Sequence, residues 1–284
     1  MNIKKLGKLA LPYLVWMLVL VGIPLLMIFI LSFMNTDGVS FAGATWTTAA
    51  WEKMFTLADT TNLQILGYTF LTAFVATVIC FLIGYPMAYI VARSPFSNKF
   101  VILILTIIPM WSNSLLRNVA LKNILSESNI LDSLLSRIGL SFSIVFANQD
   151  QATFISIVIG LVLTFLPFMI LPIYTVIEKI DESLLEASMD LGANRVRTFA
   201  KVTFPLSMKG VTTGIIMVFL PCFSGFAIQK LLSSGTVYVL GSLIEVNYIH
   251  DINFVSMLSI VILVLIFGSM MIVNKVDKEG ATLV

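Results

Sequence analysis

Six long apolar stretches decide the fold class of this chain, and none of them contains an acidic residue. They cover residues 11–33, 64–92, 100–116, 152–177, 209–229 and 253–273. A helix needs about 20 mainly apolar residues to cross the hydrocarbon of a bilayer. With 58% hydrophobic and only 11% charged residues, the chain has too few polar side chains to cover a water-facing surface. The sequence therefore predicts an all-α integral membrane protein with six transmembrane helices.

The distribution of Lys and Arg indicates how these helices are oriented. When both termini are placed in the cytoplasm, 12 of the 17 Lys and Arg residues fall on the cytoplasmic side, as the positive-inside bias requires. No A-x-A-like cleavage site follows Leu31, so we expect the first stretch to remain as a membrane helix rather than to be removed as a signal peptide.

The loops between the stretches suggest a division of the chain. We expect residues 1–63 to form an N-terminal transmembrane helix and a first outer loop, residues 64–274 a five-helix core, and residues 275–284 a cytoplasmic tail. Within the second outer loop, residues 130–138 have Leu and Ile at helical spacing, which predicts an amphipathic helix. Such a helix either lies against the bilayer or offers a docking surface.

The inner segment 178–208 carries several helix-boundary signals. Asp181 is suited to cap a helix that begins at Glu182, where carboxylates interact well with the helix dipole. Gly192 suits the left-handed position that ends such a helix. Asn194 can cap a second short helix, which we expect Pro205 to stop. A pair of helices too short and polar to span is either a structured connector or a segment that another protein holds in a groove.

Three groups of residues in this segment resemble the EAA loop of ABC importer permeases. They are Glu186-Ala187-Ser188, Gly192, and Phe204-Pro205-Leu206. The resemblance implies a type I ABC importer permease fold (MetI-like), with both termini cytoplasmic, in a multi-pass protein of the bacterial plasma membrane. It also implies that an ATPase docks on this coupling loop (residues 178–208), through Glu186, Ala187, Ser188, Asp190, Gly192, Ala193 and Arg195.

Three further segments resemble the polyamine branch of that family, specifically the first of its two permease subunits. They are residues 84–93, 108–117 and 218–221. The resemblance implies import of spermidine or putrescine by an assembly of this permease, a second permease as its heterodimer partner, two copies of an ABC ATPase and an extracytoplasmic solute-binding protein. It implies contact with membrane lipid and none with nucleic acid. Residues 247–254 follow the family pattern loosely, so a permease for another small solute is the alternative.

Other classes of membrane protein fit the sequence less well. No G-x-x-x-x-G-K-[ST] motif occurs, so we expect no ATPase site and no directly bound cofactor in this chain, and expect ATP-Mg to bind the partner ATPase. The single histidine, His250, cannot supply the usual ligand set of a zinc site. We expect no catalytic residues. An ion-gradient-driven secondary transporter would carry ionisable residues within its spans, and acidic residues are missing from all six.

A path for a polycation needs aromatic faces and carboxylates, because ammonium groups are attracted to ring faces. The candidates are Trp111, Asn113, Glu245 and Tyr248, with Asp132 and Asp150 as further possibilities near the outer mouth. Trp111 is equally suited to anchor a helix at the membrane interface.

Overall fold

The computed structural model describes residues 12–36, 43–55, 61–94, 99–125, 137 and 149–281, with residues 100, 149–152 and 272–281 described by backbone alone. Within these ranges five helices are long and apolar enough to cross a membrane: Pro12–Leu31, Thr61–Arg93, Thr153–Glu178, Arg195–Ser224 and Ile252–Met271. A sixth span is formed if the helices α5 (Lys99–Trp111) and α6 (Ser114–Leu125), which meet at an angle of 89°, cross as one. The helical membrane fold predicted from the sequence is confirmed. The amphipathic helix predicted at 130–138 lies outside the described residues, Arg137 apart.

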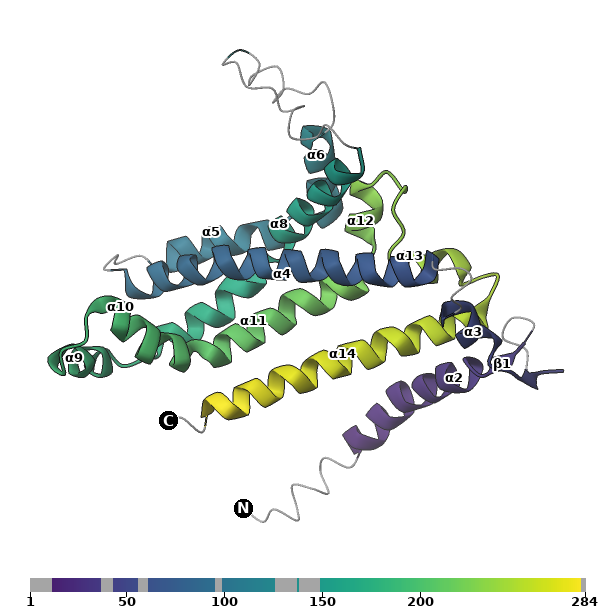
Figure 1. The fold of residues 1–284 in the computed structure, drawn as a ribbon, viewed down its shortest axis with the longest axis horizontal. Helices are drawn as coiled ribbons and strands as arrows, with labels where there is room; N and C mark the ends of the chain where they lie inside the picture. Colours follow the sequence, from purple (N-terminus) through teal and green to yellow (C-terminus); the bar gives the residue numbers. More distant parts are fainter. Residues whose placement is uncertain are drawn as a thin grey trace. The chain divides into compact units, whose positions relative to one another are not determined.

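One compact unit combines the N-terminal part of the chain with residues 240–265. Its first span contains a π turn, η1 (Leu18–Gly22), and helix α2 (Ile23–Leu31). Strands β1 (Met34–Asn35) and β2 (Thr45–Trp46) pair antiparallel, with Met34 opposite Trp46. Helices α3 (Ala49–Phe55) and α13 (Leu240–Asn247) and the start of α14 (Ile252–Ala281) complete this unit (Figure 1).

Polar contacts hold the end of the first span to the start of α14. The side-chain amide of Asn253 is buried and donates hydrogen bonds to the carbonyls of Leu31, at 3.2 Å, and of Met34. Lys53 forms an ion pair with Asp251 at 2.9 Å. These contacts fix the loop that joins the elements of the unit.

The second unit comprises residues 66–239 and 266–284. It contains most of α4 (Thr61–Arg93), then α5, α6 and α8 (Gln149–Glu178). The short helices α9 (Glu182–Asp190) and α10 (Arg195–Thr198), the π turn η3 (Phe199–Thr203), α11 (Phe204–Ser224) and α12 (Ala227–Leu232) follow. Helices α9 and α10 lie at one end of this unit, and α6 and α12 lie at the other (Figure 1).

Glycines allow α8 and α11 to pack closely at the centre of this unit. A Cβ added to Gly210 would lie 2.7 Å from the carbonyl oxygen of Pro172, and one added to Gly214 would lie 2.8 Å from the sulfur of Met169. On α4, a Cβ at Gly84 would lie 3.0 Å from the Cγ of the same Met169. Small residues bring helix backbones together in membrane proteins, so α4, α8 and α11 converge on Met169.

The third predicted span, 100–116, is interrupted, because the chain breaks at Ser112 and Asn113 between α5 and α6. The Asn113 side chain accepts hydrogen bonds from the N–H groups of Leu115, at 2.9 Å, and Leu116, at 3.4 Å. The Ser112 hydroxyl donates to the carbonyl oxygen of Pro109 at 2.8 Å. Asn and Ser side chains that bond to nearby backbone groups compete with the helical ladder, and here they end α5 and cap α6.

The predicted stop at Pro205 is also wrong. Pro205 lies at the start of α11, directly after η3, and the helical chain runs without a stop from Arg195 to Ser224. Proline is tolerated in the first turn of a helix, where no helical N–H bond is lost. The fifth span covers residues 195–224, so it begins and ends earlier than the predicted 209–229. Its C-cap is Gly225, where a Cβ would lie 2.6 Å from the carbonyl oxygen of Pro221.

Candidate functional site

The coupling loop begins with a capped helix, as its sequence predicts. The Asp181 carboxylate accepts a hydrogen bond from the backbone N–H of Ser183 at 3.0 Å. This bond, together with one from the Ser183 side chain, lowers the pKa of Asp181 below its ordinary value. Because the ionised carboxylate is the form that caps the helix, α9 starts firmly at Glu182.

A Schellman turn joins α9 to α10. The N–H of Gly192 donates to the carbonyl of Met189 at 2.9 Å, and the N–H of Ala193 donates to the carbonyl of Ser188 at 3.1 Å. Gly192 has a φ of 85°, in the left-handed region that glycine alone adopts freely. Asn194 then caps α10 by accepting from the N–H of Arg197 at 2.8 Å. The three signals read from the sequence at Asp181, Gly192 and Asn194 are confirmed.

The predicted ATPase-coupling residues lie together on this loop. Glu186, Ala187, Asp190, Gly192 and Arg195 are exposed. Ser188 and Ala193 are half-buried, and the Ser188 hydroxyl lies 3.1 Å from that of Thr198, which links α9 to α10. No ion pair joins Asp190 to Arg195 among the described residues. Exposed apolar side chains surround these charges, including Leu191 at 90% exposure and Val196 at 75%.

Two sets of contacts attach the coupling loop to the spans. At the end of α4, Arg93 donates to the carbonyl of Ile180 at 3.1 Å and lies 3.9 Å from the Glu182 carboxylate. One turn to two turns earlier on α4, the rings of Tyr85 and Tyr89 pack edge-on against Phe199, with ring centroids 5.9 and 5.2 Å apart. A displacement of α9 and α10 would therefore move α4 and α11 as well.

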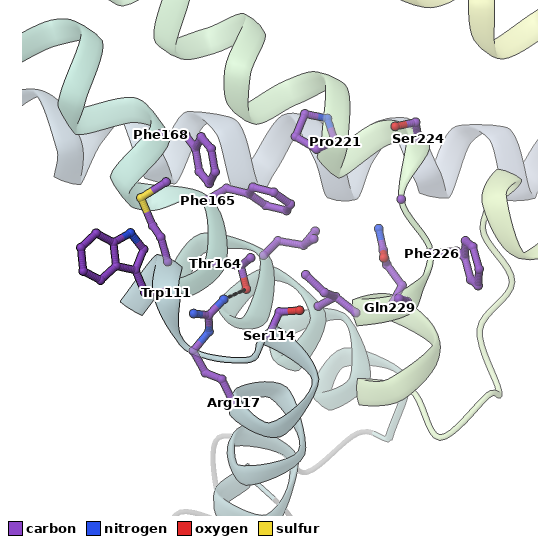
Figure 2. Close-up of a pocket in the computed structure, with 15 residues that line it drawn as sticks. Trp111, Ser114, Arg117, Thr164, Phe165, Phe168, Pro221, Ser224, Phe226 and Gln229 are labelled. Carbon is purple, nitrogen blue, oxygen red and sulfur yellow. Dashed lines mark hydrogen bonds between the residues drawn. The ribbon is translucent and has the colours of Figure 1, made fainter. Parts of the chain in front are cut away.

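A cavity of about 710 Å³ lies in the second unit, beside the α5–α6 break, within the range of roughly 300–1,000 Å³ that is usual for small-molecule sites. Figure 2 shows side chains from the α5–α6 break, from α8, and from the end of α11 with α12 around it. The α8 residues Leu161, Thr164, Phe165 and Phe168 recur at helical spacing and lie near the middle of that span. The buried Gln229 donates to the carbonyl of Cys222 at 3.1 Å, which fixes the turn between α11 and α12, and α12 packs against α6 and α8.

The lining of this cavity is mainly aromatic and apolar. It includes Trp111, Phe165, Phe168 and Phe226, and its polar groups are the hydroxyls of serine and threonine, one amide and one guanidinium. Arg117 is the single charged residue among the lining residues that the structure describes. The cavity therefore offers ring faces and apolar surface to a ligand, with few polar groups.

The guanidinium of Arg117 spans the break between α5 and α6. Nη1 donates to the carbonyl of Pro109 and to the Ser112 hydroxyl at 3.1 Å. Nη2 donates to the Thr164 hydroxyl at 3.4 Å, the bond marked in Figure 2. Its Nε is buried and has no hydrogen-bond partner within the described part of the chain. A helix end leaves carbonyls without helical partners, and Arg117 takes up one of those at the end of α5.

The predicted path residues are only partly brought together. Trp111 lines the cavity with 85% of its surface exposed, whereas Asn113 caps α6 and is absent from the lining. Glu245 and Tyr248 are exposed and belong to the other unit. Asp132 and the side chain of Asp150 lie outside the described residues.

Sequence reasoning missed the cavity residues Arg117, Thr164 and Phe168. The sequence held a usable signal for Arg117. Pro109 and Asn113 indicate that a helix ends within this apolar run, and a cation shortly after them can bond to the carbonyls of that helix end. For the α8 residues we find no local signal, since in an apolar helix a cavity-facing ring looks like a lipid-facing one.

Comparisons with known proteins give the class of this chain. The family described as "Binding-protein-dependent transport system inner membrane component" matches residues 82–279, and the chain belongs to this family. It is a multi-pass permease of the bacterial plasma membrane. The membership predicted from the coupling loop is confirmed.

Curated relatives of this chain cover nearly its whole length. The spermidine/putrescine transport system permease protein PotB of Escherichia coli K12 is 34% identical over 260 residues, which are 91% of this chain and 92% of that protein. PotB of Haemophilus influenzae is 35% identical over 84% of this chain and 81% of its own length. A PotB homolog of Mycoplasma genitalium is 32% identical over 89% of this chain and 82% of its own length.

Solved structures confirm the fold. A bacterial ABC transporter for import of the acidic polysaccharide alginate matches with a TM-score of 0.73, covers 95% of each chain and is 13% identical. The bacterial alginate transporter in complex with a pentasaccharide-bound periplasmic protein gives a TM-score of 0.74 at 13% identity, over 97% of this chain and 94% of that one. The chain thus has the type I ABC importer permease fold.

Proposed function

We propose that this chain is one permease subunit of an ATP-driven importer that carries polyamines, such as spermidine and putrescine, into the cytoplasm. The observation that carries the proposal is the identity of 34% with a spermidine/putrescine permease over 91% of the chain. The predicted segments 84–93, 108–117 and 218–221 fall within this similarity, and the second of them forms the α5–α6 break and its cavity residues.

The chemistry of the cavity supports an organic amine as the cargo. An ammonium group over a ring face gains about 0.5–2 kcal/mol, depending on how far it is desolvated, and methylene chains pack on apolar walls. Trp111, Phe165 and Phe168 offer such faces. No carboxylate occurs among the described lining residues, so we infer that the second permease of a heterodimer supplies acidic groups across the pore.

The coupling loop supports an ATPase as the source of force. Two ABC ATPase subunits, which hold ATP-Mg, would bind the coupling loops of the two permeases. Glu186 and Asp190 would present charge to the ATPase, the small Ala187 and Ser188 would allow close approach, Gly192 would make the turn, and Ala193 and Arg195 would complete the contact. An extracytoplasmic binding protein would deliver the cargo at the opposite face, which agrees with the family description.

The helix that carries the force also forms the cavity wall. Residues 195–224 are one helical run, with the coupling loop at its start and the lining residues Pro221 and Ser224 at its end. At 1.5 Å per residue such a run is roughly 45 Å long. Movement of the loop by an ATPase would therefore be carried directly to the cavity.

The proposal is tested by purifying the chain with its native partners, placing the complex in liposomes and measuring uptake of radiolabelled spermidine. Uptake is expected only with the binding protein and with ATP on the ATPase side. Trp111→Ala should lower uptake severalfold, whereas Trp46→Ala, which changes a tryptophan of β2 that is 73% exposed, should leave it unchanged. ATP-driven uptake of another solute but not of polyamines would refute the cargo. Uptake by the chain alone, without any ATPase, would refute the class of transporter.

A further inference from the structure

The charge on the cavity wall has the same sign as the proposed cargo. Arg117 lines the cavity beside residues from the middle of α8, and no carboxylate of the described residues lies within ion-pair distance of it. Its polar contacts are with neutral oxygens, those of Pro109, Ser112 and Thr164. An uncompensated guanidinium in a span is costly and by default marks a functional position.

A passage for organic cations also risks conducting inorganic ones. Carbonyl and hydroxyl oxygens inside a pore are the groups that replace the water shell of a potassium or sodium ion. At the α5–α6 break, the carbonyl of Pro109 and the hydroxyl of Ser112 are oxygens of this kind, and the Arg117 guanidinium occupies both of them. The same side chain thus removes oxygen ligands and places a fixed positive charge beside the cavity.

We propose that Arg117 is an electrostatic barrier that keeps small inorganic cations from leaking through this permease. The inference rests on the proposed function, since it assigns the cavity to the path of a cation. At an effective dielectric constant of about 20, two unit charges about 8 Å apart repel strongly enough to lower the occupancy of an ion about 30-fold. A fixed arginine excludes cations from other membrane pores by the same physics.

A polyamine can pass this barrier where a bare ion cannot. Its ammonium groups are separated by methylene segments, so the chain can place a methylene segment beside Arg117 and its charges over the rings of Trp111, Phe165 and Phe168. Each ammonium group must also pass the guanidinium, but the other ammonium groups can lie over the rings at that moment, whereas a potassium ion passes without such compensation. Arg117 is therefore a specificity-determining residue that acts by repulsion.

The test measures passive ion flux through the purified complex in liposomes, without ATP or polyamine. Arg117→Gln is expected to raise potassium efflux roughly tenfold or more, while Arg117→Lys, which keeps the charge, leaks as little as the wild type. Lys122→Gln removes a charge from the same helix α6 at a position that does not line the cavity, and should not leak. Thr164→Asp places a carboxylate against the guanidinium and should leak even if Arg117→Gln does not assemble.

Chloride efflux separates a lost charge from a damaged pore. The proposal expects chloride efflux to stay at the wild-type level in Arg117→Gln. It is overturned if potassium efflux does not rise, if potassium and chloride rise together, or if Ser112→Ala, which loosens the contact but keeps the charge, leaks as much as Arg117→Gln. These measurements need no polyamine, so failure of the proposed cargo would appear separately, as a wild-type complex that takes up no spermidine.

Discussion

The structure allows an estimate of the conformational strain that a substitution of Gly192 introduces into the coupling loop. Gly192 has a φ of 85°, and a Cβ there would meet no atom within 4 Å, so a substitution is strained by backbone conformation alone. An L-residue costs about 1–2 kcal/mol in the left-handed region, and a β-branched one costs more. If the ATPase binds only the native turn, Gly192→Val should weaken its binding by about 5- to 30-fold or more. Asn tolerates this region best among the other residues, so Gly192→Asn should have a small effect.

The assay titrates the purified ATPase into the permease complex in detergent and measures the dissociation constant. Gly235 supplies a matched control, because it has a φ of 79°, also has no atom within 4 Å of an added Cβ, and lies in the turn after α12. Gly235→Val should strain the fold by a similar amount and leave ATPase binding intact. If Gly192→Val binds the ATPase with wild-type affinity, or if both valine variants lose affinity equally, the ATPase does not depend on the conformation of the Gly192 turn.

Three further outcomes follow from the described contacts. Gly210→Ala forces a methyl group to 2.7 Å from the carbonyl oxygen of Pro172 and should destabilise the complex by about 1–3 kcal/mol. The control is Gly67→Ala, whose added methyl group meets no atom within 4 Å. Thermal unfolding in detergent measures the difference between the two variants. Because the pKa of Asp181 is lowered in the folded loop, the ionised cap stabilises α9 above the ordinary pKa and is lost as the pH falls through the folded value. The protection factors of the α9 amides, which correct for the intrinsic pH dependence of exchange, should therefore fall below pH about 4, and this fall should be smaller in Asp181→Asn. Asn113→Ala removes the cap of α6 and should cost about 1 kcal/mol, with faster amide exchange confined to the first turn of α6; unchanged exchange there would mean that Asn113 does not hold the break.

The structure of the coupling loop was predictable because it depends on interactions between residues close together in the sequence. Asp181, Gly192 and Asn194 each act on backbone groups within three residues of themselves, so their identity alone determines what they do. The five unbroken spans were predictable for a related reason, since a bilayer imposes a minimum length on any helix that crosses it.

The break in the third span and the cavity were not predictable in the same way. Hydropathy averages over about 19 residues, and two polar side chains at Ser112 and Asn113 barely change such an average. Pro205 was misread because proline ends a helix only where an N–H bond is needed, and the π turn before it removes that need. The cavity depends on α12 turning at Gly225 and packing against α6 and α8, and these tertiary contacts have no local sequence pattern.

If an ATPase moves the coupling loop as proposed, the π turn η3 lies where that movement would enter α11. A π turn has poorer hydrogen bonding than an α turn and recurs at functional sites, so it is the point at which residues 195–224 can change direction at least cost. Its first residue, Phe199, packs against the rings of Tyr85 and Tyr89 on α4. Above it, Gly210 and Gly214 lock α11 against α8. Under the proposed mechanism, bending would be confined to this one turn, and the rest of α11 would move as a rigid helix that ends at the cavity residues Pro221 and Ser224.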